Sequence, residues 1–140
     1  MYRLNNLVRS LLFTPADRKS ALEKAWSNTN LDVLIIDMED AVAGTSSAKN
    51  LARHNLEWFM REKSSPINSR IKNCQPNIVV RINCPTTSLF GVDDLALLED
   101  LPNVDAVLIP KTECVNNIVA IAKRIKTAKI WCMIETPKGN

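Results

Sequence analysis

Residues 33–40, with the sequence VLIIDMED, place four consecutive aliphatic residues directly before three acids in four positions. The aliphatic run has no polar alternation, which is typical of a strand covered on both faces in a parallel sheet. Four further short apolar runs also end in polar or charged residues: 11–13, 78–80, 106–109 and 130–134. Amphipathic helical patterns separate most of the runs, so the sequence predicts an α/β fold with a parallel sheet.

Five strand–helix units correspond to part of an eight-stranded α/β barrel, which typically needs about 250 residues. The chain has 140 residues, and five strands cannot close such a barrel. From the pattern alone, a barrel and an open sheet of parallel strands are both possible. Ligands bind at the carboxyl ends of parallel strands, so the chemistry is expected on one rim.

Helix signals lie between the apolar runs. Thr14 and Pro15 predict a helix start, with Thr14 as N-cap and Pro15 at the first helical position. A second helix follows Gly44, and its apolar face is expected to hold Leu51, Ala52, Leu56, Phe59 and Met60, with Lys49 elsewhere. A later helix is marked by Val115, Ile118, Val119, Ala122 and Ile125. Residues 63–77, rich in Ser, Asn and Pro, predict the longest irregular loop.

The composition, 46% hydrophobic and 24% charged, is that of an ordinary globular domain. The net charge of +3 comes without a basic run or interleaved aromatics, so no nucleic-acid partner is expected. No run approaches the roughly 20 apolar residues of a membrane span. Residues 1–13 have arginines and no acid, a faint transit-peptide character, but their apolar part reads better as a strand and the cytoplasm is the expected location.

The four cysteines are far apart and form no C-x-x-C motif, which favours reduced thiols over a metal or redox motif. They are Cys74, Cys84, Cys114 and Cys132. Cys132 lies within an apolar run, where a small thiol is expected to pack as a hydrophobe.

Asp37, Glu39 and Asp40 follow the second apolar run. Carboxylates so close together need a cation or solvent around them. They suit a metal ion, a water held by a metal, or helix capping, and a solvated loop is an equally good interpretation of the pattern alone.

Three further strand-end residues are candidates. Arg81 and Asn83 point to the same side of an extended chain, and the guanidinium suits a bidentate grip on a carboxylate or an ion pair with a neighbouring acid. Lys111 permits a Schiff base, although a salt bridge is the stronger expectation. Glu135 suits a hard cation such as magnesium or pairing with a nearby Lys or Arg. The single histidine, His54, fits a solvated helix position better than general-base duty.

Six motifs in order resemble the HpcH/HpaI aldolase and citrate lyase β-subunit superfamily, within its citrate lyase β-like branch. Each motif is weak alone, and six in the right order are specific. The resemblance spans nearly all of this chain but only about the first half of a family barrel. In chain order the motifs are residues 9–16 RSLLFTPA, 36–42 IDMEDAV, Lys49 with 52–53 AR, 80–83 VRIN, 109–111 IPK and 134–137 IETP.

This resemblance implies a partial TIM (β/α)8-type barrel of about five strand–helix units of eight, in a single truncated domain over residues 1–140. It also implies a magnesium-dependent carbon–carbon lyase. The implied substrate is a 3-hydroxyacyl thioester, such as a citryl or malyl thioester of coenzyme A or an acyl carrier protein. By the same resemblance Arg81 binds the oxyacid end of the substrate and Glu135 binds Mg²⁺, so both are assigned as catalytic and substrate-binding. Glu39 and Asp40 are placed near the water shell of the metal or beside an arginine, with Asp37 and Lys111 in support.

Two departures from the family pattern bear on this assignment. A second metal-binding aspartate normally follows on the next strand, and this chain ends before it, so the metal site is expected to be incomplete. The aldolase branch tends to have a histidine directly after the strand-end glutamate, where this chain has Asp40. That difference favours the thioester-lyase branch.

Other functions stay open at this stage. They are a non-catalytic truncated fragment, a binding module that keeps Arg81 without turnover, and a class I aldolase that uses Lys111 as its Schiff-base nucleophile. A barrel that lacks strands exposes two sheet edges and apolar surface. We therefore expect a homo-oligomer or association with another chain.

Overall fold

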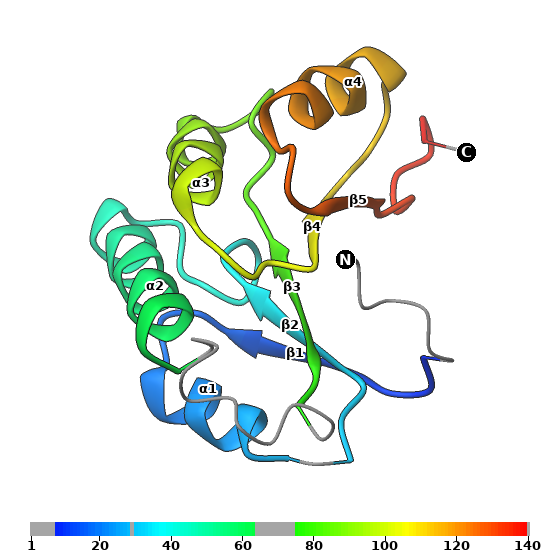
Figure 1. The fold of residues 1–140 in the computed structure, drawn as a ribbon. Helices are drawn as coiled ribbons and strands as arrows, with labels where there is room; N and C mark the ends of the chain where they lie inside the picture. Colours follow the sequence, from blue (N-terminus) through cyan, green and yellow to red (C-terminus); the bar gives the residue numbers. More distant parts are fainter. Residues whose placement is uncertain (1–7, 29, 64–74, 140) are drawn as a thin grey trace.

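The computed structural model describes residues 8–28, 30–63 and 75–139. Within them, five parallel strands form one sheet in the order β1-β2-β3-β4-β5, and helices follow the first four strands (Figure 1). This arrangement confirms the predicted α/β fold of a partial TIM-barrel type. The strands are β1 (Leu11–Pro15), β2 (Val33–Asp37), β3 (Asn77–Arg81), β4 (Ala106–Ile109) and β5 (Lys129–Cys132). The helices are α1 (Lys19–Trp26), α2 (Ser46–Trp58), which continues into the π-helical turn η1 (Phe59–Lys63), α3 (Leu89–Asp100) and α4 (Val115–Arg124).

The register of the sheet brings the strand ends together. Pro15 pairs with Asp37, and Asp37 pairs with Arg81, so β1, β2 and β3 end at the same level. Arg81 in turn pairs with Leu108 of β4. Residues that follow these strands therefore gather at one rim of the curved sheet.

Both faces of the sheet carry buried side chains at its centre. Leu34 and Ile36 pack into the large cluster between the sheet and the helices, whereas Val33 and Ile35 belong to a second cluster on the opposite face. Because fully burying one such side chain stabilises the fold by about 1.5–3 kcal/mol, the two clusters hold the sheet together. The unbroken aliphatic run of β2 is thus explained by burial on both sides.

The helix start predicted at Thr14 and Pro15 is wrong. Both residues belong to β1, and α1 begins at Lys19 without a side-chain cap. Pro15 pairs with Asp37, and the N–H of Ala16 donates to the Asp37 carbonyl at 2.9 Å. Pairing with the neighbouring strand keeps this segment extended against its local helix signal.

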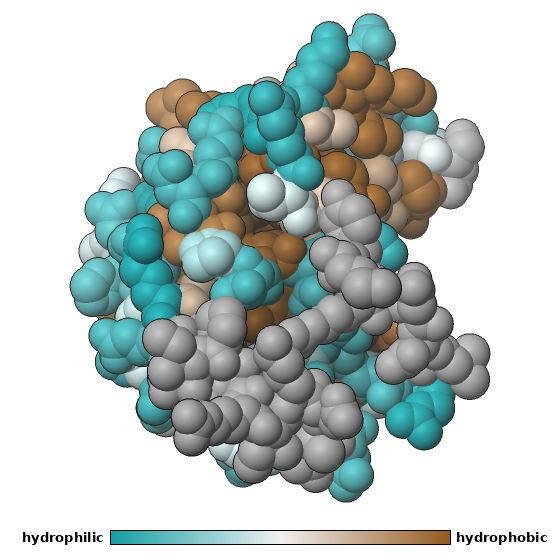
Figure 2. Space-filling model, in the orientation of Figure 1, coloured by the Kyte–Doolittle hydropathy of each residue, from teal (hydrophilic) through white to brown (hydrophobic). Residues whose placement is uncertain are grey.

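The predicted apolar faces of two helices also need correction. On α2, Leu51 is 49% exposed while Lys49 is buried, because Leu51 lies about 100° from Ala52 around the helix axis. On α4, Val115 and Val119 are exposed while Ile121 is buried. Figure 2 shows hydrophobic residues at the surface in the region of α4.

The remaining differences concern the fifth strand and the long loop. β5 ends at Cys132, so Ile134 lies beyond the strand and is exposed. Cys132 is exposed as well, against the expectation that it packs as a hydrophobe. Most of the loop predicted over residues 63–77 lies outside the described residues. In the part of the chain that the structure describes, no helix has the length and apolar character needed to cross a membrane.

Candidate functional site

Arg81 and Asp37 form the centre of the strand-end rim. Nε and Nη2 of Arg81 donate to the two carboxylate oxygens of Asp37 at 2.9 and 2.5 Å, and both side chains are buried. This is the bidentate geometry for which a guanidinium is suited. The carboxylate that Arg81 grips in this structure is therefore supplied by the neighbouring strand of its own sheet.

The third nitrogen of the Arg81 guanidinium faces other groups. Nη1 lies 3.5 Å from Oε2 of Glu39 and 3.9 Å from the sulfur of Met133. The ring of Phe13 lies 5.0 Å from the guanidinium carbon, within the range of a cation–π contact. Burial alone would lower the pKa of Arg81, but the hydrogen bond to Asp37 and the surrounding carboxylates outweigh it and raise this pKa. Arg81 therefore carries a fixed positive charge. Its Nη1 is the guanidinium nitrogen that makes no hydrogen bond to Asp37.

Lys111 connects three of the predicted site residues. Its backbone is left-handed, with φ of 48°, and its side chain crosses to the acids after β2. Nζ donates to Oε1 of Glu39 and lies 3.3 Å from Oδ2 of Asp40, while its backbone N–H donates to Oε1 of Glu135 at 2.8 Å. The hydrogen bond to Glu39 is the main cause of a raised pKa for Lys111. These contacts match the ion-pair interpretation of Lys111, because a Schiff-base lysine requires a lowered pKa.

Three side chains hold the segment that carries Glu39. The buried Lys49 ammonium donates to the carbonyls of Met38 and Glu39, both at 2.7 Å, and Asn83 Nδ2 donates to the Met38 carbonyl at 2.9 Å. The Glu39 N–H donates to Oδ1 of Asp37 at 2.9 Å. Burial lowers the pKa of Lys49, partly opposed by nearby carboxylates. Hydrogen bonds with these three side chains thus fix the position of the loop after β2.

A second buried carboxylate supports Asn83. Asp94 of α3 accepts hydrogen bonds from the backbone N–H and Nδ2 of Asn83 at 2.9 and 2.7 Å, and from Arg53 of α2 at 2.9 Å. Asn83 was expected to face the rim. Its side chain instead holds the loop after β2, through a hydrogen bond to the carbonyl of Met38. The sequence analysis missed Asp94 and the supporting role of Lys49. The i,i+4 spacing of Lys49 and Arg53 was the available signal, since it places both on one side of a helix.

The structure brings most of the predicted site residues into one cluster. Asp37, Glu39, Asp40, Arg81 and Lys111 are joined by direct ion pairs. Glu135 joins them through the backbone N–H of Lys111. In contrast, His54 is exposed on α2, as predicted.

The carboxylates of this cluster fit a hard divalent cation in their chemistry, because such ions prefer oxygen ligands. One oxygen, Oε2 of Glu39, is buried and accepts no hydrogen bond from the described residues. The described residues do not, however, bring three or more acidic, histidine or cysteine side chains into a preformed metal-binding group. Glu39 and Asp40 instead face the ammonium of Lys111.

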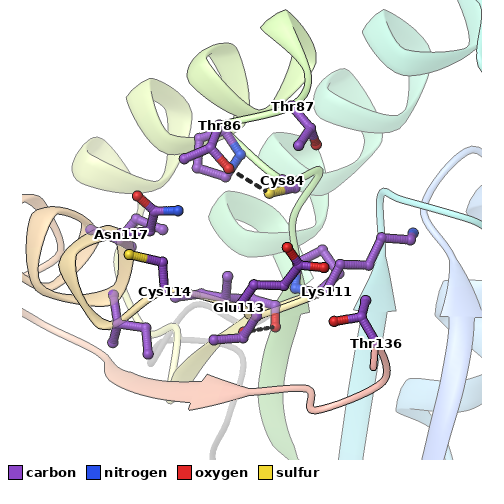
Figure 3. Close-up of a pocket in the computed structure, with 14 residues that line it drawn as sticks. Cys84, Thr86, Thr87, Lys111, Glu113, Cys114, Asn117 and Thr136 are labelled. Atoms are coloured by element: carbon purple, nitrogen blue, oxygen red, sulfur yellow. Dashed lines mark hydrogen bonds between the residues drawn. The ribbon is translucent and has the colours of Figure 1, made fainter. Parts of the chain in front are cut away.

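A pocket of about 220 Å³ adjoins this cluster, between the loops that follow β3 and β4 (Figure 3). Its walls include Lys111, Glu113 and Thr136 beside the rim, and Cys84 and Cys114. Burial would raise the pKa of the Cys84 thiol, but hydrogen bonds from Thr86 and Thr87 more than offset it and lower this pKa. The pocket was not foreseen from the sequence, because its residues are neutral or scattered along the chain.

Comparison with known proteins gives a consistent family. Residues 9–137 match the family model for HpcH/HpaI aldolase/citrate lyase. A (3S)-malyl-CoA thioesterase of Cereibacter sphaeroides strain ATCC 17025 is 34% identical over 133 residues, which cover 94% of this chain and 41% of that protein. A citrate lyase subunit beta-like protein of Deinococcus radiodurans is 33% identical over 109 residues, covering 76% of this chain and 34% of that protein. The chain spans less than half the length of these relatives.

Proposed function

We propose, from the premise that this chain belongs to the HpcH/HpaI aldolase/citrate lyase family, that its rim serves carbon–carbon bond cleavage or formation in an acyl thioester. The observation that carries the proposal is the cluster of Arg81, Lys111 and four carboxylates from neighbouring strand ends. The malyl-CoA in the name of a relative suggests a coenzyme A thioester of a 3-hydroxy acid. An acyl carrier protein thioester presents the same reacting atoms.

In the proposed reaction, the hydroxyl at carbon 3 loses its proton and the bond between carbons 2 and 3 breaks. The fragment that holds carbon 3 leaves as a 2-oxo acid with a new carbonyl. The thioester enolate that remains takes up a proton at carbon 2. Arg81 is assigned to the oxyacid end, where Nη1 offers hydrogen bonds and a positive charge for the oxygens that become negative. Asp37 fixes the plane of the guanidinium through its two hydrogen bonds.

We assign Glu135 as the residue that holds Mg²⁺, with Glu39 and Asp40 near its water shell. The oxygen-rich carboxylate chemistry of the cluster supports this assignment. When bound, the ion would act as a Lewis acid toward the carbonyl of the oxyacid.

Thioester hydrolysis is a second candidate, because the Cereibacter sphaeroides relative is named a thioesterase. The two reactions give different products from the same substrate. Cleavage of malyl-CoA between carbons 2 and 3 yields glyoxylate and acetyl-CoA, whereas hydrolysis yields malate and free coenzyme A. A thiol reagent detects free coenzyme A and a hydrazine reagent detects glyoxylate, so one sample separates the two functions.

The test is turnover of malyl- and citryl-CoA by the purified chain with and without Mg²⁺. We expect Mg²⁺-dependent glyoxylate or oxaloacetate formation, reduced at least about 100-fold in Arg81→Lys, because a lysine cannot reproduce the fork held by Asp37. Glu135→Gln should lose the Mg²⁺-dependent turnover, because it removes the proposed metal ligand. Glu99→Gln on α3 serves as the control and should keep this turnover. Thioester binding without turnover would favour the binding module, and absence of both would favour a non-catalytic fragment.

We further propose that residues 1–140 act as one barrel-type domain in the cytoplasm and associate with a second copy or another chain. Exposed apolar residues on β1 and α4 support the association. Sedimentation of the purified chain tests it.

A further inference from the structure

The pocket between the loops after β3 and β4 lies directly beside Glu135. Thr136, the next residue in the chain, lines the pocket, and so does Lys111, whose backbone N–H donates to Oε1 of Glu135 at 2.8 Å. The hydroxyl oxygen of Thr136 is buried and has no hydrogen-bond partner among the described residues. A ligand held at Glu135 therefore has this pocket next to it, with one hydroxyl still able to form a hydrogen bond.

Most of the pocket wall is aliphatic or uncharged. Ile109 and Ile121 are each 3% exposed and line it. Two of its threonines already have partners, because Thr112 donates to the Ile109 carbonyl at 3.1 Å and the Thr86 hydroxyl lies 3.1 Å from the Cys84 thiol. The volume of about 220 Å³ compares with roughly 30 Å³ for one water molecule in the liquid. The pocket therefore has room for a short branch of a ligand, charged or uncharged.

The charges at the wall distinguish between these two kinds of branch. The charged side chains that line the pocket are those of Lys111 and Glu113. The ammonium of Lys111 is paired with Glu39 and Asp40, and Figure 3 shows the Lys111 side chain extending away from the pocket. Glu113 is exposed and has no ion pair among the described residues. A carboxylate that entered the pocket would be repelled by Glu113 and would lose water against aliphatic side chains.

We propose that this pocket receives the third substituent of carbon 3 in the thioester, and that Glu113 restricts this substituent to hydrogen or an uncharged alkyl group. The inference rests on the proposed function and narrows its substrate class. Malyl thioesters carry hydrogen at this position and fit the pocket. Citryl thioesters carry a carboxymethyl group there and are disfavoured. Carbon 3 becomes the carbonyl carbon of the 2-oxo acid on cleavage, so the same selection applies to that product.

The test compares two 2-oxo acids of nearly the same shape. Freshly dissolved oxaloacetate carries a carboxymethyl group on its carbonyl carbon, and 4-methyl-2-oxopentanoate carries an uncharged isobutyl group. Isothermal titration calorimetry of the purified chain with Mg²⁺ present measures both dissociation constants without requiring turnover. In the unmodified chain we expect 4-methyl-2-oxopentanoate to bind about three- to tenfold more tightly, as expected for one partly screened like-charge pair.

Replacement of Glu113 separates its charge from the other differences between the two acids. Glu113→Gln should tighten oxaloacetate binding by about three- to tenfold, because the repulsion is removed, and should leave 4-methyl-2-oxopentanoate unchanged. Glu113→Lys should favour oxaloacetate further. Glu57→Gln, on α2, is the matched control for loss of one negative charge and should change neither dissociation constant. An equal gain for oxaloacetate in Glu113→Gln and Glu57→Gln, or no gain in either, would overturn the role of Glu113.

Two other results would overturn the selection itself. One is oxaloacetate binding as tight as that of 4-methyl-2-oxopentanoate in the unmodified chain, and the other is absence of binding of both acids in every variant. Failure of the proposed function is distinguishable, since it would abolish turnover of malyl-CoA while leaving the difference between the two acids intact. Conversely, equal turnover of malyl- and citryl-CoA would support the proposed function and contradict the selection.

Discussion

Asp37 illustrates how much of the rim depends on one carboxylate. Its Oδ1 accepts hydrogen bonds from both Nε of Arg81 and the backbone N–H of Glu39, while its Oδ2 accepts from Nη2 of Arg81. One buried side chain therefore sets the orientation of the guanidinium and the start of the acidic loop. Any change at this position acts on the charge and on the geometry of the site together.

Asp37→Asn should destabilise the fold by about 3 kcal/mol, because it leaves the buried Arg81 without its charged partner. The free energy of unfolding in urea measures this loss. Asp93→Asn is the matched control, since Asp93 is an exposed partner of Arg53, and its effect should be below about 1 kcal/mol. Similar losses in the two variants would show that the Asp37–Arg81 pair adds nothing specific.

Cys84 should form its thiolate at a lower pH than an ordinary cysteine. Hydrogen bonds from Thr86 and Thr87 lower the pKa of Cys84 despite its partial burial, so the thiolate fraction at a given pH is raised. The pH dependence of iodoacetamide labelling, read by peptide mass spectrometry, measures this pKa. Thr86→Val should move the labelling curve of Cys84 toward higher pH, and an unchanged curve would argue against the hydrogen bond.

At the scale of elements, hydrophobic runs and strand-end motifs were sufficient to predict five strands and their common rim. Register and helix orientation were not predictable in the same way, because they depend on neighbouring elements. Thr14 and Pro15 carry a local helix signal, yet pairing with β2 keeps them in a strand. A charged lysine is expected at the surface, yet Lys49 is buried. Its ammonium donates hydrogen bonds to two backbone carbonyls that follow β2.

Part of the candidate site could be predicted from the sequence, and part could not. Asp37 and Arg81 could be identified because each directly follows an apolar run, and Glu39 and Asp40 because they come within three positions of Asp37. The partners that hold them, above all Asp94 and Lys49, are on helices and become neighbours only through packing. The direct grip of Arg81 on Asp37 likewise depends on strand register, which an apolar run alone does not specify.

Two leucines on α2 provide a test of which face packs against the sheet. Leu56 is fully buried and Leu51 is 49% exposed. Leu56→Ala should destabilise the fold by about 2–5 kcal/mol through loss of burial and creation of a cavity. Leu51→Ala should cost less than about 1 kcal/mol, and thermal or urea unfolding compares the two. Equal costs would mean that α2 is rotated relative to this description.

At the scale of the whole molecule, the sheet has two edges among the described residues, at β1 and at β5. Leu11, Leu12 and Phe13 are all exposed on β1, and a groove of about 410 Å³ runs between this strand and α1. Parallel edges with unpaired backbone groups favour association with other chains.

Leu12→Glu should therefore lower the apparent mass of the purified chain in sedimentation velocity, by placing a charge on the β1 edge. Leu12 is 42% exposed, so the substitution should leave the core intact. Leu89→Glu is the control, because Leu89 is 85% exposed at the start of α3. If both variants sediment alike, the β1 edge is not the surface through which the chain associates.

The sequential strand order has a consequence for biosynthesis. Each strand pairs with the one made just before it, and α1 packs against both β1 and β2. Pairing of a strand in the described sheet therefore does not have to wait for a strand that is translated later. As the chain leaves the ribosome, β2 can dock on β1 before β3 exists, and every later unit finds its template already in place. The Asp37–Arg81 pair then forms as soon as the third strand emerges, so the chemistry of the rim is assembled in the order in which it is translated.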